Sequence, residues 1–251
     1  MLGFAVEALG DRVTATRTAE PGVRIAAVRG VAGELPREPG RNTAGRACEA
    51  LLARAAAGFG VALELDKGIP LASGLGGSAA SAVAAVVATN ALLERPLPLA
   101  ELLEPALAGE AVATGGGRAF DNVAPSLLGG LVLTVGSAEP RPTRLPVPPG
   151  VVAVLVHPRI AVVTAQARAI LRREVPLADH VAQCANLAGF VTACHSGDLA
   201  LLAASFRDVV IEPQRAGLVP GFAAAQAAAL AAGALGCSIS GAGPTTFAWA
   251  R

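Results

Sequence analysis

The sequence contains no tyrosine, a single tryptophan and few charged residues, which make up 16% of its 251 positions. Acidic and basic side chains nearly balance, and a formal net charge of +1 gives no general attraction for nucleic acid or for an anionic membrane. Hydrophobic residues account for 53%, which excludes an intrinsically disordered chain. The composition is that of a compact globular protein, long enough for one large domain or two ordinary ones.

Long apolar runs and targeting signals are also missing. The longest apolar stretch, 79–93, is interrupted by Ser81, Thr89 and Asn90 and is shorter than the ~20 residues of a membrane-spanning helix. The N-terminal "MLGFAVEALG" has neither a basic region nor a cleavage site, so it is not a signal peptide. We therefore expect a cytoplasmic protein with no nucleic-acid and no membrane partner, and the sequence leaves a homodimer open.

The four cysteines form no C-x-x-C pair and have no metal-site spacing with the three histidines. This pattern predicts reduced, buried thiols that pack as small hydrophobic side chains, at Cys48, Cys184, Cys194 and Cys237.

Glycine and alanine are abundant, and both are concentrated in the stretch "IPLASGLGGSAASAV" at 69–83. Gly74, Gly76 and Gly77 precede an alanine-rich helix predicted to reach about Leu93. A flexible loop that points N–H groups inward, at the positive end of a helix, is typical of a phosphate site. A tight turn that needs glycine only for close packing is the structural alternative.

Two known phosphate motifs can be compared with this loop. No lysine follows the glycines, which excludes a Walker A loop. Residues 74–79, "GLGGSA", fit the relaxed dinucleotide fingerprint G-x-G-x-x-[GA], so a dinucleotide-binding oxidoreductase remains an alternative.

Four other segments carry predictions about structure. Five prolines in 136–150 indicate a linker and a domain boundary, and Pro105 is predicted to interrupt a helix over 98–113. The run "VVAVLVHP" at 151–158 predicts a buried strand, and "EPQRAGLVPGF" at 212–222 predicts a loop.

The segment "PLASGLGGSAAS" at 70–81 resembles the P-x-x-x-G-L-G-[SG]-S-[SA]-A motif of the GHMP kinases, which are small-molecule kinases unrelated to the P-loop enzymes. Five further blocks, in order, resemble the homoserine kinase branch of that family. They are "FDNVAPSLLGG" (120–130), "TAQARAIL" (164–171), "ANLAGFV" (185–191), "VIEPQRAGLVPGF" (210–222) and "GALGCSISGAGPTTFA" (233–248).

The resemblance implies an α+β protein with the two-domain GHMP kinase fold. Residues 1–145 would form an N-terminal α/β domain like ribosomal S5 domain 2, and 146–251 a ferredoxin-like α+β domain. The implied activity is ATP- and Mg²⁺-dependent phosphorylation of the side-chain hydroxyl of L-homoserine, for threonine biosynthesis, by direct in-line transfer. A GHMP kinase for a mevalonate-pathway or shikimate-type substrate, and an inactive nucleotide-binding remnant, are the alternatives.

The resemblance also assigns residues. The ATP-binding set is Asn42, Pro70, Ser73, Gly74, Leu75, Gly76, Gly77, Ser78 and Ala79, and the Mg²⁺ ligands are Ser78 and Glu110. The implied catalytic residues are Asn122 and Arg168, with Asp121 as a base in a minority interpretation. The implied substrate-binding residues are Asn122, Thr164, Arg168 and Arg215.

Each assignment has a structural alternative. Ser78 and Asn42 would serve as helix N-caps, and Glu110 and the two arginines as solvated surface charges.

Three departures from the family pattern accompany these assignments. The segment that normally precedes the equivalent of Leu2-Gly3, with its first strand and substrate ligands, is missing, and the chain stops at "FAWAR" before a further helix and strand. Ala119 replaces a usual histidine. We therefore expect a fragment or a mis-assigned start codon, with weakened homoserine binding.

Overall fold

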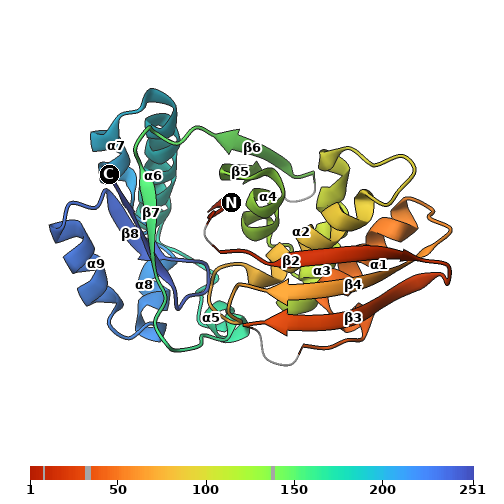
Figure 1. Cartoon of the computed structure of the whole chain (residues 1–251). Helices are drawn as coiled ribbons and strands as arrows, with labels where there is room; N and C mark the ends of the chain where they lie inside the picture. Colours follow the sequence, from red (N-terminus) through yellow and green to blue (C-terminus); the bar gives the residue numbers. More distant parts are fainter. Residues whose placement is uncertain (8, 32–34, 137–138) are drawn as a thin grey trace. The chain divides into compact units, whose positions relative to one another are not determined.

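The computed structural model describes residues 1–7, 9–31, 35–136 and 139–251 (Figure 1). These residues form two compact units. The first comprises Met1–Leu71 and Gly76–Arg144, and the second comprises Ala72–Leu75 and Leu145–Arg251. The chain therefore passes from the first unit to the second inside the glycine loop and returns after four residues, which the sequence did not indicate.

The first unit contains two three-stranded sheets within its described residues. In one, the central strand β4 (Gly60–Lys67) pairs antiparallel with β2 (Arg12–Thr18) and parallel with β3 (Gly22–Gly30). The other has the order β1-β5-β6, with β1 at Leu2–Phe4, β5 at Leu131–Val135 and β6 at Arg141–Leu145. Strand β4 is buried except at Glu64 and Asp66, as expected for a central strand with helices on one face.

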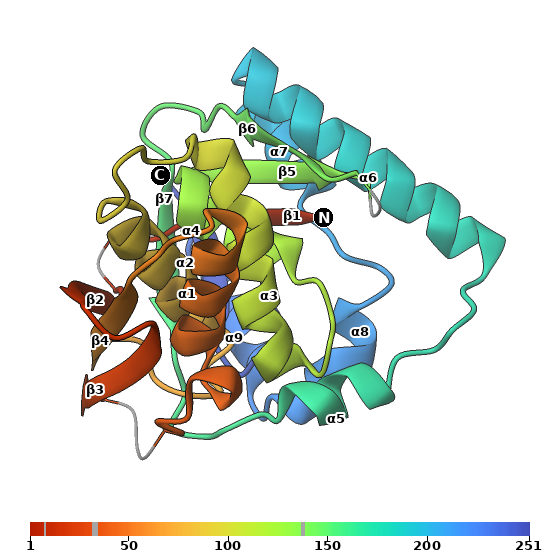
Figure 2. The same cartoon turned by 90° about the vertical axis from the view of Figure 1, so that its right-hand side faces the viewer.

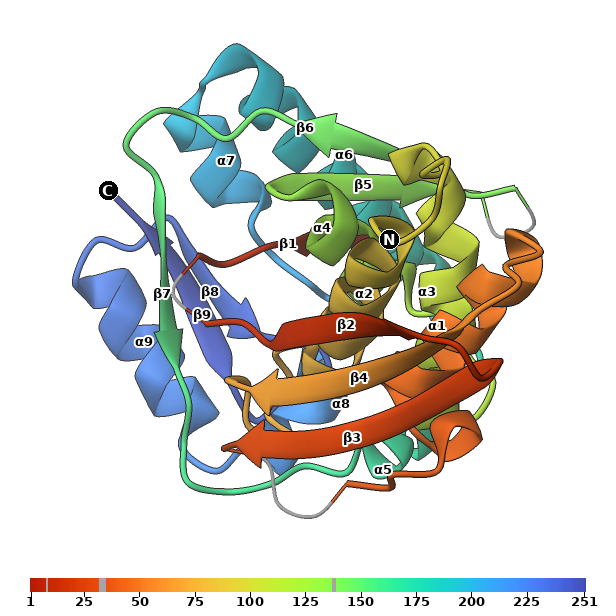
Figure 3. The same cartoon turned by 45° about the vertical axis from the view of Figure 1, so that its right-hand side comes forward.

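Four α-helices cover these sheets in the described part of the first unit. They are α1 (Thr43–Arg54), α2 (Gly77–Asn90), α3 (Leu103–Thr114) and α4 (Phe120–Leu128), with 3-10 turns at Pro39–Arg41 and Leu99–Leu102. Helices α1 and α2 form a middle layer. Their inner faces pack on the β2-β4-β3 sheet, and their outer faces pack on α3 and α4 (Figures 2 and 3). Because α2 is buried on both sides, its alanine-rich, nearly charge-free sequence suits this position.

Two helix predictions in this unit are wrong in detail. Helix α2 ends at Asn90 rather than near Leu93, because the next residues form tighter turns, with Leu92 N donating to Thr89 O. Pro105 does not interrupt α3 but occupies its first turn, where a backbone N–H would have no partner within the helix.

The second unit has a sheet of order β7-β9-β8 in its described residues, with both pairings antiparallel. The strands are β7 (Val152–Val156), β8 (Gly236–Ile239) and β9 (Thr246–Ala250). The helices are α5 (Thr164–Ala169), α6 (Leu177–Ser196), α7 (Leu199–Ser205), α8 (Glu212–Arg215) and α9 (Phe222–Ala231), with a 3-10 turn at Ala216–Leu218. Phe190 of α6 packs on Trp249 of β9 with ring centroids 5.4 Å apart, so an aromatic cluster joins helix and sheet.

Three predictions for the C-terminal half need correction. The predicted linker 136–150 contains strand β6, whose proline is tolerated at a sheet edge, while its residues 137 and 138 lie outside the described ranges. The predicted loop begins with the helical residues of α8. Strand β7 is not buried: its valines are about half exposed, because β7 is an edge strand and they lie on the face opposite the aromatic cluster.

A helix with the length and hydropathy needed to span a bilayer is absent from the described ranges.

The thiols differ from the sequence prediction in one case, because Cys184 is exposed while Cys48, Cys194 and Cys237 are buried. Burial raises the pKa of the Cys48 thiol to about 11 and also raises the pKa values of Cys194 and Cys237. A raised pKa keeps the thiol protonated and unreactive at pH 8.

We therefore expect a chromogenic disulfide reagent at pH 8 to titrate one thiol rapidly in the folded protein and all four in denaturant. Rapid modification of a Cys184→Ser variant in its folded state would contradict this assignment.

Candidate functional site

The N-terminus of α2 has the geometry of an anion site. Gly76 is the N-cap residue with a φ of 67°, a left-handed conformation that glycine adopts without strain. The first turn of α2 contains no acidic residue, so no carboxylate offsets the partial positive charge there. Ser78 is the second residue of the helix and is half-buried. It is therefore not the N-cap that the structural alternative proposed.

Asn122 lies beside this helix start. Asp121 and Asn122 both belong to the first turn of α4, and both are half-buried. A Cβ atom at Gly76 would lie 3.4 Å from Asn122 Oδ1, so the asparagine side chain packs directly against the glycine loop. Strand β1 packs closely against the same turn of α4, since a Cβ at Gly3 would lie 1.9 Å from Asp121 O. The first unit thus brings the predicted phosphate helix and the predicted catalytic asparagine together.

Glu110 is a buried carboxylate on α3, the helix that packs against both α1 and α2. Its residue is 2% exposed, which rules out the solvated surface charge that was its structural alternative. Burial of a carboxylate is costly unless a cation or hydrogen bonds compensate it. Its buried position is compatible with the predicted role as a cation ligand.

The residues present fit Mg²⁺ as a ligand shared with a nucleotide. The described residues contain no group of three His, Cys, Asp or Glu side chains that could hold a metal ion by themselves. Mg²⁺ prefers oxygen ligands and usually takes only one or two protein side chains, completing its shell with phosphates and waters. One carboxylate and one hydroxyl, from Glu110 and Ser78 on two packed helices, match that requirement.

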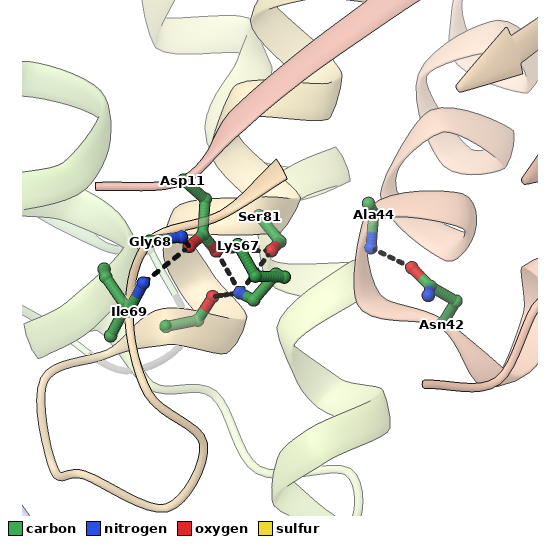
Figure 4. A network of polar contacts seen from close by, with 8 residues as sticks. Asp11, Asn42, Ala44, Lys67, Gly68, Ile69 and Ser81 are labelled. Carbon is green, nitrogen blue, oxygen red and sulfur yellow. Dashed lines mark hydrogen bonds and ion pairs between the residues drawn. The ribbon is translucent and has the colours of Figure 1, made fainter. Parts of the chain in front are cut away.

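Asn42 performs the capping role that was its structural alternative. Its Oδ1 accepts a hydrogen bond from Ala44 N at 3.0 Å (Figure 4). The same oxygen accepts from Gly45 N at 3.3 Å, and the side-chain amide donates to Pro36 O at 2.8 Å. The residue is 4% exposed. Its contact with ATP remains a prediction.

The first half of the glycine loop is held by the turn between β8 and β9, within the second unit. Ser240 Oγ donates to Gly74 O at 2.8 Å, and Thr245 Oγ1 donates to Ser73 O at 2.6 Å. Gly74 has a φ of 78°, and a Cβ there would lie 2.5 Å from Ser240 O. These contacts hold the loop backbone at Ser73 and Gly74.

His157 extends this set of contacts, and the sequence analysis did not identify it. Its Nδ1 lies 2.9 Å from Thr245 Oγ1. Because the single hydroxyl hydrogen of Thr245 is directed at Ser73 O, the histidine Nδ1 is the donor in this bond. His157 directly follows strand β7, and the pairing of β7 with β9 brings it close to Thr245, which the sequence does not show.

The predicted substrate-binding residues of the second unit are also close to one another. Arg215 ends α8, and its guanidinium donates to Ala167 O at 3.3 Å and to Gly241 O at 2.7 Å. Ala167 precedes Arg168 on α5, and Arg168 and Thr164 are exposed one helical turn apart. Arg215 therefore ties the helix of Arg168 to the "SGAGP" turn. A pair of arginines in such an arrangement suits a carboxylate or a phosphate.

Comparison with known proteins shows similarity over nearly the whole chain. The family described as "GHMP kinases N terminal domain" matches residues 42–130, and "GHMP kinases C terminal" matches residues 190–251. A homoserine kinase of Xanthomonas campestris pv. campestris is 50% identical over 99% of this chain and 76% of its own length. One from Xylella fastidiosa is 51% identical over the same shares. The chain belongs to the homoserine kinase family of the GHMP kinases.

Solved structures agree with this family membership. The crystal structure of homoserine kinase from Cytophaga hutchinsonii has a TM-score of 0.95 and 42% identity, and the match covers 99% of this chain and 79% of that one. Mevalonate kinase from L. major, at 18% identity and a TM-score of 0.70, shares the fold. The predicted α+β GHMP kinase fold is confirmed. The dinucleotide alternative does not fit, because β4 pairs with one antiparallel and one parallel strand rather than within a doubly wound parallel sheet.

A buried network near the family's glycine loop was missed by the sequence analysis. Lys67 and Asp11 form an ion pair, and Ser81 of α2 is hydrogen-bonded to both of them (Figure 4). A signal existed: Lys67 continues the alternation of apolar residues at 61, 63 and 65 in β4, which places its side chain on the buried face.

Proposed function

We propose that this chain transfers the γ-phosphoryl group of ATP to the side-chain hydroxyl of L-homoserine, giving O-phospho-L-homoserine and ADP. The observation that carries the proposal is its 50% identity to homoserine kinases over 99% of its length. The arginine arrangement of the second unit supports an amino-acid substrate, because Arg168 and Arg215 offer the cations that a substrate carboxylate requires.

Phosphoryl transfer depends on positioning and on stabilising the charge of the transferred group. In the proposal, the N–H groups of Gly74–Ser78 bind the phosphates, and Pro70, Leu75 and Ala79 shape the loop around them. Asn122 orients the reacting hydroxyl, and Thr164, Arg168 and Arg215 bind the amino acid. The hydroxyl oxygen forms a bond to the γ-phosphorus as the bond to the β–γ bridging oxygen breaks. The hydroxyl proton passes to an oxygen of the transferred phosphoryl group and is then lost to water.

Glu110 and Ser78 would hold Mg²⁺ in this arrangement. When bound, the ion supplies positive charge to the phosphate oxygens. The buried position of Glu110 is the observation that supports this role. A cytoplasmic location and a homodimer stay predictions.

General-base catalysis by Asp121 is the less favoured alternative to direct transfer. It lies next to Asn122 on α4, within the same helical turn. Direct transfer requires no base, and an Asp121→Asn variant that keeps most of its turnover rate is the outcome expected from the proposed mechanism.

An ATP-coupled assay with L-homoserine, mevalonate and shikimate as acceptors tests the substrate. We expect turnover with homoserine and none with the other two, and the product should comigrate with O-phospho-L-homoserine. Equal or faster turnover of mevalonate or shikimate would show that the chain acts on a different substrate.

Replacing Arg168 with glutamine should raise the KM for homoserine about 10- to 100-fold, the effect of losing one charged hydrogen bond of ~1.5–3 kcal/mol. The KM for ATP should change little. Arg173, which is exposed beyond the end of α5, provides the control substitution Arg173→Gln. Equal effects of the two variants on the homoserine KM would remove Arg168 from the substrate site.

A further inference from the structure

We propose that Asp11, Lys67 and Ser81 form a buried brace that positions the glycine loop for phosphate binding without touching the ligand. The proposal rests on the proposed function, since it concerns the ATP loop of that reaction. It assigns a positioning role to three residues that the mechanism above does not use.

The brace is a closed set of polar contacts (Figure 4). Lys67 Nζ donates to Asp11 Oδ2, to Ser81 Oγ at 2.7 Å and to Gly77 O at 2.8 Å. Ser81 Oγ donates to Asp11 Oδ2 at 2.6 Å. The other carboxylate oxygen, Asp11 Oδ1, accepts from Gly68 N and Ile69 N, each at 3.1 Å. Each hydroxyl and ammonium hydrogen therefore has an acceptor, as a buried network requires.

The contacts tie together the two ends of the loop. Strand β4 ends at Lys67, and the first two N–H groups of the loop, those of Gly68 and Ile69, donate to Asp11. The chain enters α2 at Gly77, whose carbonyl is bound by Lys67. One ion pair thus fixes both the start and the end of the segment 68–76, and Ser81 anchors it one turn further along α2.

The burial of these three side chains argues against direct contact with a nucleotide. The side chains of Lys67 and Asp11 are 2% and 1% exposed, and Ser81 is also 2% exposed. The lysine charge is neutralised by its partner and enclosed by protein. Its effect on a nucleotide must therefore be transmitted through the backbone of Gly77, which opens the helix where the phosphates would bind.

The energetics also indicate a positional role. A buried ion pair is often no more stabilising than well-packed neutral side chains of similar size, because desolvation offsets the attraction. What a neutral pair lacks is the fixed geometry of these donors and acceptors. Misplacement of a binding group by about 1 Å costs on the order of 100-fold in rate, so loss of the brace should appear in ATP binding before it appears in stability.

The test uses the full chain and measures MgATP binding by calorimetry, homoserine kinetics and thermal unfolding. The double variant Asp11→Asn/Lys67→Met removes both charges while keeping side-chain volume, and Ser81→Ala removes only the hydroxyl. We expect the Kd and the KM for ATP to rise about 10- to 100-fold in the double variant and about 5-fold in Ser81→Ala. The KM for homoserine should change less than 2-fold.

A matched control lies at the other end of the same helix. The Asn90 side chain donates to Leu97 O at 3.0 Å and accepts from Leu97 N at 2.8 Å, far along α2 from the loop. Asn90→Ala should lower the unfolding temperature but leave the Kd for ATP unchanged. ATP affinity within 2-fold of the parent in both brace variants, or an equal loss in Asn90→Ala, would overturn the proposal.

The experiment also separates this inference from the proposed function. If the parent chain binds MgATP but does not phosphorylate homoserine, weakened ATP binding in the brace variants still supports the brace, and only the substrate is wrong. If the parent phosphorylates homoserine and the variants bind ATP normally, the brace is wrong and the function stands. A parent chain that binds no MgATP would overturn both.

Discussion

Replacing Glu110 with glutamine is expected to lower kcat for homoserine phosphorylation about 100-fold or more, the effect of removing one preorganised charged group from a transition state. Glutamine keeps the size and shape of the side chain but not its charge, so a cation would lose its protein carboxylate. The Mg²⁺ concentration required for half-maximal rate should rise with the loss in kcat. Kinetics at fixed ATP over a range of Mg²⁺ concentrations measure both effects.

The same helix offers a control. Glu104, one and a half turns earlier on α3, is exposed and forms a surface ion pair with Arg118. Surface pairs of this kind contribute about 0–1 kcal/mol, so Glu104→Gln should leave kcat and the Mg²⁺ requirement unchanged. An unaltered Mg²⁺ requirement in Glu110→Gln, with the protein folded, would mean that this carboxylate is not a metal ligand.

The substitution Gly74→Ala should lower kcat/KM for ATP by about 100-fold, because the added methyl group forces the loop backbone to move by roughly the 1 Å that misaligns a bound substrate. The added Cβ would meet Ser240 O at 2.5 Å and Gly243 O at 2.6 Å, both backbone atoms of one rigid turn. The φ of 78° adds ~1–2 kcal/mol of strain for any residue with a side chain. Steady-state kinetics with ATP varied at saturating homoserine measure the loss.

Gly197, at the C-terminal end of α6, provides a control that distinguishes backbone strain from a steric clash. It has a similar φ of 73°, but a Cβ there would meet nothing within 4 Å. Gly197→Ala should therefore lower the free energy of unfolding by about 1 kcal/mol and leave the ATP kinetics as they are. If Gly74→Ala behaves like Gly197→Ala, the contact between the loop and the β8–β9 turn does not matter for catalysis.

The sequence alone was sufficient to predict the elements whose structure depends on residues close together in the chain. The glycine loop and the helix after it follow from the backbone freedom of glycine and the helix propensity of alanine. The structure bears out α2 as the helix after the loop. Ordered blocks along most of the chain indicated the family, which the comparisons confirm.

Sequence reasoning failed where the outcome depends on neighbours far along the chain. Burial of β7 was predicted from its run of valines, yet β7 is an edge strand and the sheet face that carries its valines is exposed. Cys184 was predicted to be buried by residue type, although it lies on the exposed side of α6. For Glu110 only the structural alternative, a solvated surface charge, is wrong, because α3 places the residue in the interior; its predicted role as a Mg²⁺ ligand stays a prediction.

The sequence by itself determined the family and the position of the glycine loop, and it predicted that this loop binds phosphate. The tertiary structure decided how that loop is held. Its first half is fixed by Ser240 and Thr245, and its ends by Asp11 and Lys67. Apart from Lys67, which directly precedes the loop, each partner lies at least 57 positions from the residue that it binds, so no local pattern contains it. Only folding brings their donors and acceptors within hydrogen-bonding distance.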